Sequence, residues 1–102
     1  MADDGKVLGD VATRVLVEND RVKIWEMDLQ PGEESDEHRH DRDYILVILE
    51  GDRIAGISTD GRDDIYADVH PGLTAYLTKG GTEIARNIGE KRYHEILIEL
   101  KD

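Results

Sequence analysis

The chain has 102 residues, with 13 Lys and Arg against 24 Asp and Glu, so its formal net charge is −11. This length predicts one domain with a single core. The acidic balance argues against nucleic acid or anionic lipid as a partner, because both are bound by clustered Lys and Arg.

The chain has no cysteine, which excludes disulfides and thiolate metal sites and fits a cytoplasmic protein. Residues 1–6 are polar where a secretory signal would be basic and then apolar. The longest apolar run, residues 45–49, is far too short to span a bilayer. We expect a cytoplasmic protein with a flexible segment over residues 1–12 and one folded domain over 13–102.

From Arg14 onward the sequence predicts short strands separated by turns. Breaks at Pro31-Gly32, Asp60-Gly61 and His70-Pro71-Gly72 match the turn chemistry of proline, aspartate and glycine. No stretch of ten or more residues has a helical period, so we predict an all-β sandwich or barrel. The expected strands cover residues 15–17, 22–29, 44–49, 53–59, 65–69, 73–77, 84–88 and 93–100. Residues 44–49 are apolar on both faces, which is typical of a strand covered on both sides.

Two histidines, His38 and His40, are two residues apart, so on a strand both imidazoles point to the same face. Neutral imidazole is the commonest metal ligand, and this pair is half of a metal site. Continued parity would turn Tyr44 to the same side and Asp43 away from it. The alternative is a solvated loop, since residues 33–43 are polar throughout.

Other candidate residues are weaker. Trp25 and Met27 share a strand face and are expected to pack in the core or in a dimer interface. His70 precedes a turn and is expected on the surface. His94 alternates with isoleucines on the last strand and could point into a barrel as a core histidine.

The spacing of these residues resembles the cupin family. Gly32, His38, His40 and Gly51 fit its first motif, with Tyr44 where the family has glutamate. The second motif is matched by Gly72, Gly80 and Asn87, with Thr78 replacing proline and Glu83 replacing histidine. The resemblance covers residues 13–101 and implies an antiparallel jelly-roll-like β-barrel, the double-stranded β-helix, with its site at the barrel mouth. It also implies a homodimer that pairs through the N-terminal strands.

Two departures from the family's motifs, Tyr44 for glutamate and Glu83 for histidine, bear on whether this chain binds metal. His38, His40 and Glu83 would form a 2-His-1-carboxylate set, which suits Fe(II) and accommodates Mn(II), Zn(II) or Ni(II). Tyr44 would be a fourth ligand as phenolate, or a proton donor near the metal. The alternative is that both substitutions record the loss of metal. Acidic neighbours attract a divalent cation but also favour protonated imidazole, so metal occupancy should fall as pH drops.

Two classes of function follow from this resemblance. The first is a metal-dependent enzyme acting on a small polar metabolite, as a dioxygenase, isomerase or lyase, in which Tyr44 orients substrate or moves a proton. The second is a binding or sensing cupin that holds a small ligand without turnover and without metal. Within the family, the chain most resembles the small single-domain cupins associated with β-alanine degradation.

Overall fold

The structure is a computed structural model that describes residues 7–101. Its regular elements are all β-strands, which confirms the predicted all-β class. In chain order they are β1 (Arg14–Glu18), β2 (Val22–Leu29), β3 (His38–Arg39), β4 (Tyr44–Glu50), β5 (Arg53–Ser58), β6 (Ile65–Asp68), β7 (Thr74–Leu77), β8 (Thr82–Asn87) and β9 (Tyr93–Leu100). Within the described residues there is no helix long and apolar enough to cross a membrane.

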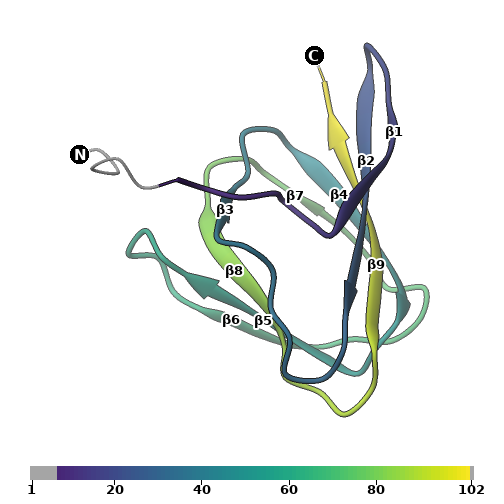
Figure 1. The fold of residues 1–102 in the computed structure, drawn as a ribbon, viewed down its shortest axis with the longest axis vertical. Coiled ribbons are helices and arrows are strands. Elements are labelled where there is room, and N and C mark those ends of the chain that lie inside the picture. Colours follow the sequence, from purple (N-terminus) through teal and green to yellow (C-terminus); the bar gives the residue numbers. More distant parts are fainter. Residues whose placement is uncertain (1–6, 102) are drawn as a thin grey trace.

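The strands form two antiparallel sheets. One has the order β1-β2-β9-β4-β7 and the other the order β3-β8-β5-β6. Figure 1 shows them on opposite sides of a barrel, with the chain ahead of β1 running across from the four-stranded sheet to the five-stranded one. A backbone hydrogen bond from the Gly9 amide to the Glu37 carbonyl holds that segment beside β3.

The core lies between the two sheets and is made by alternate residues of each strand. On β9 the side chains of Tyr93, Glu95, Leu97 and Glu99 are buried, and those between them are half-buried. On β2 the buried Trp25 and Met27 face the same interior, which confirms their assignment to the core. Because Trp25 is only 5% exposed, its face is not available to a second copy of the chain.

The alternation also corrects two expectations. His94 lies on the outer face of β9, half-buried, with its Nε2 2.6 Å from Oε2 of Glu26. It does not point into the barrel, because the inward positions of β9 are the odd-numbered ones. The second face of β4, which includes Ile45 and Val47, is half-buried on the outside of the five-stranded sheet, where no other layer of the described residues covers it.

Residues on either side of the predicted boundary at residue 12 pack onto the barrel. Val11 and Ala12 are buried in the core cluster, and the Thr13 amide donates to the Glu26 carbonyl. Residues 1–6 of the expected flexible segment lie outside the described residues. The division into residues 1–12 and 13–102 therefore stays a prediction.

The glycine that closes the first motif is required by its backbone. Gly51 follows β4 with φ at 142°, a conformation that L side chains rarely adopt. A Cβ at this position would stand 2.9 Å from the Tyr93 ring. The turn from β4 to β5 thus depends on glycine, and it packs directly against a buried aromatic residue of β9.

Candidate functional site

The predicted histidine pair lies on the four-stranded sheet and faces the barrel interior. His38 is on β3 and His40 follows directly after it; their exposed fractions are 1% and 3%. The two ring centroids are 4.8 Å apart with the planes nearly perpendicular. Both imidazoles are thus inside the barrel, and the alternative of a solvated loop is wrong for these two side chains.

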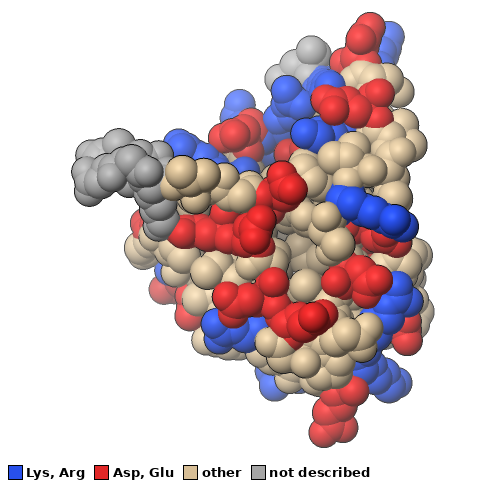
Figure 2. Space-filling model, viewed as in Figure 1, with Lys and Arg blue, Asp and Glu red and all other residues tan. Residues whose placement is uncertain are grey.

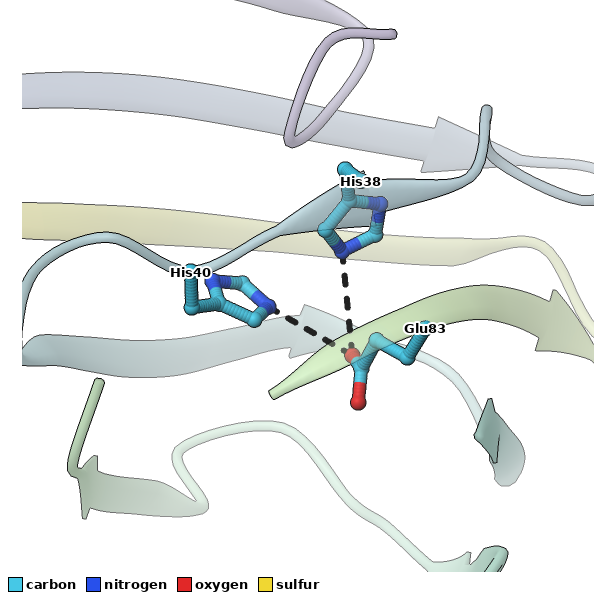
Figure 3. A group of neighbouring side chains, drawn as sticks. All are labelled: His38, His40 and Glu83. Carbon is cyan, nitrogen blue, oxygen red and sulfur yellow. Dashed lines mark ion pairs between the residues drawn. The ribbon is translucent and has the colours of Figure 1, made fainter. Parts of the chain in front are cut away.

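The third predicted residue, Glu83, meets the pair from the neighbouring strand. Its Cα is the register partner of His38 across the β3–β8 pairing. Its Oε2 lies 3.7 Å from Nε2 of His38 and 3.5 Å from Nε2 of His40, as drawn in Figure 3. The ligand atoms of these three residues all lie within 4.8 Å of one another, so the group could hold a metal ion.

Hydrogen bonding fixes the orientation of one ring. The Nδ1 of His38 lies 2.8 Å from the Asp36 carbonyl oxygen, which accepts its hydrogen. That bond leaves the lone pair on Nε2, the nitrogen that faces Glu83. Metal-bound histidines are held in the same way by a backbone or carboxylate acceptor.

The donor set fits a divalent transition metal. Two ligands about 2.1 Å from a common ion stand roughly 3.0–3.5 Å apart, according to the coordination geometry. The N···O separations of 3.5 and 3.7 Å are close to that range and longer than a hydrogen bond. Two imidazoles and one carboxylate are the ligands that Fe(II) and its first-row neighbours accept.

The electrostatics of the group keep Glu83 ionised. The imidazoles of His38 and His40 lower its pKa to about 2, against the opposing effect of burial. Burial lowers the pKa of His38, but Glu83 and the Asp36 carbonyl outweigh it, and the net shift is upward. Without metal, the carboxylate and His38 therefore stabilise each other's charged forms.

Tyr44 reaches this group from the other sheet. It begins β4, and its ring stacks on His40 with centroids 4.0 Å apart and planes 14° apart. Strand β3 ends at Arg39, before Tyr44 begins β4. His38, His40 and Tyr44 therefore all face the interior without being on one continuous strand. Burial, Glu83 and Glu95 raise the pKa of the Tyr44 phenol, which keeps it protonated.

Asp43 points away from this group, as predicted, and accepts hydrogen bonds from the Tyr76 hydroxyl and the Lys79 amide.

Two further polar residues that face the same interior, Glu95 and Tyr93, were not predicted from the sequence. Glu95 is 3% exposed at the centre of β9 and accepts a hydrogen bond from the hydroxyl of Tyr93. Burial raises the pKa of Glu95 to about 7, since the Tyr93 bond offsets only part of the cost of its charge. In sequence, Glu95 shares one face of an alternating strand with Glu99, whereas the other face is the more apolar one, so the inward direction of its side chain could not be predicted.

One cavity of about 280 Å³ lies between the sheets, and its polar lining residues are His38, His40, Tyr44, Glu83, Tyr93 and Glu95. Ile65 of β6 lines the cavity and is 61% exposed, which marks a side where the cavity meets solvent. Figure 2 shows acidic side chains across the middle of one face of the molecule, whereas Lys and Arg lie mainly toward its top and its edges.

Comparisons with known proteins bear on the fold. No family model and no curated protein matches the sequence. Among solved structures, a cupin-domain protein from Bordetella pertussis Tohama I matches with a TM-score of 0.75 and 22% identity, over 92% of this chain and 100% of its own. The fold is the cupin fold.

Two enzymes share this cupin fold. A polyketide cyclase from Streptomyces resistomycificus has a TM-score of 0.61 and 17% identity, over 82% of this chain and 57% of its own. An oxalate oxidase in complex with the substrate analogue glycolate has a TM-score of 0.61 and 22% identity, over 76% of this chain and 40% of its own. The fold thus supports more than one chemistry, and the function has to be argued from the cavity itself.

Proposed function

We propose that this cupin binds one divalent transition metal ion through His38, His40 and Glu83 and acts as a metal-dependent enzyme on a small molecule. The observation that carries the proposal is the convergence of two Nε2 atoms and one carboxylate oxygen inside the barrel. The Nδ1 bond to Asp36 supports it, because it leaves the His38 Nε2 lone pair facing the other two ligand atoms. Fe(II), Mn(II), Zn(II) and Ni(II) are the candidate ions.

A bound ion of this kind supplies Lewis acidity or, for a redox metal, oxygen chemistry at the barrel interior. The residues of the chain hold protons that could be transferred to a bound molecule, and they exclude water from the cavity. Tyr44 carries a proton on a phenol directly beside His40, where it can donate to a bound molecule. Glu95 holds a second proton within the same cavity, at a pKa near neutrality. The reaction type, whether dioxygenase, isomerase or lyase, follows from the metal and the ligand.

A second candidate function is a ligand-binding cupin without metal. The close approach of the Glu83 carboxylate to both imidazoles favours it, because this carboxylate offers both rings an acceptor in the absence of an ion. In that case the cavity would hold a small molecule without turnover.

Elemental analysis of protein purified without a histidine tag separates the two. After incubation with Fe(II), Mn(II), Zn(II) and Ni(II) in turn and removal of excess, we expect about one ion per chain for at least one metal. Asp41→Asn is the matched control, since Asp41 adjoins His40 in sequence but is 79% exposed on the outside. Protein that stays metal-free with all four ions would contradict the proposal and favour the binding module.

We also infer that the protein is a homodimer. The outer face of the five-stranded sheet carries aliphatic and aromatic side chains from four strands, including Val17 at 47% exposure, Tyr76 at 59% and the half-buried Ile45, Val47 and Ile98. A second copy of the chain would cover this face by two-fold pairing, and β1 supplies an edge strand beside it. A monomer mass by light scattering at micromolar concentration would contradict it.

Two further expectations belong to the same proposal. The lack of cysteine supports a cytoplasmic location. The association with β-alanine degradation rests on the sequence resemblance, and the cavity described below argues for a less polar ligand than β-alanine.

A further inference from the structure

The wall of the cavity is divided sharply by polarity. Six of the 20 lining residues are polar: His38, His40, Tyr44, Glu83, Tyr93 and Glu95. The other 14 have no polar side-chain atom except the thioether of Met27, and they come from both sheets. Among the described residues that line it, there is no lysine, arginine, serine, threonine, asparagine or glutamine.

The polar residues form one continuous group. Tyr44 stacks on His40, and Glu83 lies beside both His40 and His38. Glu95 binds Tyr93 and lies close enough to His38 and Glu83 for their charges to act on it. The cavity therefore offers one polar region, and the rest of its wall is aliphatic.

That division limits the ligand. A molecule with several hydroxyl, amino or carboxylate groups would place some of them against aliphatic side chains with no partner, at the full cost of their desolvation. A hydrocarbon body instead gains by leaving water for such a wall. The volume of about 280 Å³ exceeds that of a roughly 150 Å³ cavity that takes benzene, and it lies at the small end of ligand pockets.

Building on the proposed metal site, we propose that the ligand is a small, largely hydrocarbon molecule with a single acidic oxygen-bearing head. The head lies at the polar group, where two imidazoles and one carboxylate leave a divalent ion with net positive charge. The body lies among residues such as Leu46, Ile54, Val69, Leu73 and Leu97. This ligand is less polar than the small polar metabolite expected from the sequence.

Calorimetry on the Zn(II)-loaded protein at pH 7.5 tests the proposal with straight-chain carboxylates. From acetate to butyrate to hexanoate we expect the affinity to rise by about threefold to fourfold for each methylene, the factor that corresponds to about 0.8 kcal/mol. Benzoate should bind at least tenfold more tightly than malonate or β-alanine. Equal affinity along the series, or tighter binding of malonate or β-alanine, would overturn the inference and leave the metal site standing.

Two variants test whether the hydrocarbon body of the ligand lies in the cavity. Ala75→Leu adds three carbon atoms to the lining, on an inward position of β7 opposite Leu46, and should weaken hexanoate at least tenfold while Zn(II) still binds. Thr74→Leu, the next residue on the exposed outer face, is the control and should bind hexanoate as wild type does. Unchanged hexanoate affinity in a folded Ala75→Leu protein would contradict the placement.

The metal-free protein separates this inference from the proposed function. If Zn(II) does not bind, the metal site and the position of the acidic head are both wrong. Chain-length dependence measured with hexanol on the same protein, against ethanol, then decides whether the aliphatic wall still takes the body. Absence of that dependence would overturn this part as well.

Discussion

The two sheets each contribute one carboxyl group to the same cavity, and they give the two groups opposite pKa shifts. Glu83, on the four-stranded sheet, lies between two imidazoles that lower its pKa to about 2. Glu95, on the five-stranded sheet, accepts a hydrogen bond from Tyr93, and burial, with the charge of Glu83 in the same direction, raises its pKa to about 7. Neighbouring imidazoles favour the charged form and burial favours the neutral one, so one cavity contains an ionised carboxylate on one sheet and, on the other, a carboxyl that holds its proton up to near-neutral pH.

The largest effect that tests this contrast is on metal binding by Glu83. Glu83→Gln keeps the shape and an oxygen but removes the charge that faces the ion, so it should weaken Zn(II) nearly as much as His38→Ala. We expect losses of about a hundredfold or more, beyond the cost of outer-shell changes. Titration with Zn(II) and a competing chelator measures both.

Two further variants accompany Glu83→Gln: Glu83→His tests a replacement ligand, and Asp43→Asn is the control. The first supplies a third imidazole and should retain metal with an altered preference among Fe, Zn and Ni. The second changes a carboxylate bound to Tyr76 and Lys79 outside the barrel and should bind as wild type. Loss of metal in Asp43→Asn but not in Glu83→Gln would show that the ligand set is wrong.

Glu95 should govern how the stability of the metal-free protein depends on pH. Its pKa is about 7 when folded and 4.5 ordinarily, so the folded state holds an extra proton between these values. This contribution to stability is fully present below pH 4.5 and is lost as pH rises through 7, by up to about 3 kcal/mol. Glu95→Gln cannot lose a proton, so its stability relative to wild type should rise between pH 5 and 8.

Urea unfolding of chelator-treated protein at several pH values measures that difference. Glu90→Gln, in the exposed turn before β9, is the control with no expected change in slope. If Glu95→Gln shows the wild-type pH dependence, the buried carboxyl is not held neutral.

Metal binding should weaken in acid because of the histidines and not because of Glu83. The pKa of His38 is raised, whereas Glu83 stays ionised down to about pH 2. Protons therefore compete with the ion as pH falls, and each protonated imidazole should cost about tenfold in affinity per pH unit. A Zn(II) affinity that stays constant from pH 7.5 to 5.5 would show that the ion binds elsewhere.

The smallest expected effect is that of the Tyr44 hydroxyl on metal affinity. Its phenol is protonated and stacked on His40, so Tyr44→Phe should leave the Kd for Zn(II) within about threefold. A more than tenfold loss would identify Tyr44 as a ligand in its phenolate form. If metal binding is unchanged, a fall in turnover would support its role as a proton donor.

The strands and the position of the histidine pair could be predicted because their signals are local. Turn residues such as Pro31 and Gly61 fix where strands end, and β-strand parity places His38 and His40 on one face. The approach of Glu83 to that pair is implied by the resemblance of residues 72–87 to the second cupin motif, in which Glu83 takes the place of a histidine. Its role as a ligand stays a prediction until a metal is measured.

The faces of the last strand could not be predicted from the alternation, because the face with fewer charged residues is the one that lies outside. His94 and the isoleucines of β9 lie outside, whereas Glu95 and Glu99 lie inside. The interior accepts these two glutamates because each has a hydrogen-bond donor: Tyr93, two residues away on the same face of β9, donates to Glu95, and the Trp25 indole of β2 donates to Glu99. The contact of Trp25 with Glu99 depends on the pairing of β2 with β9, which the alternation along one strand does not encode.

X-ray absorption spectroscopy of the Zn(II)-loaded, tag-free protein tests the central claim most directly, because it reports the ligands of the bound ion. We expect one zinc per chain with scattering from two imidazoles and oxygen ligands for the remainder, and one fewer imidazole in His38→Ala. Fewer than two imidazoles in the wild-type spectrum, or no zinc retained at all, would contradict a metal centre built from His38, His40 and Glu83.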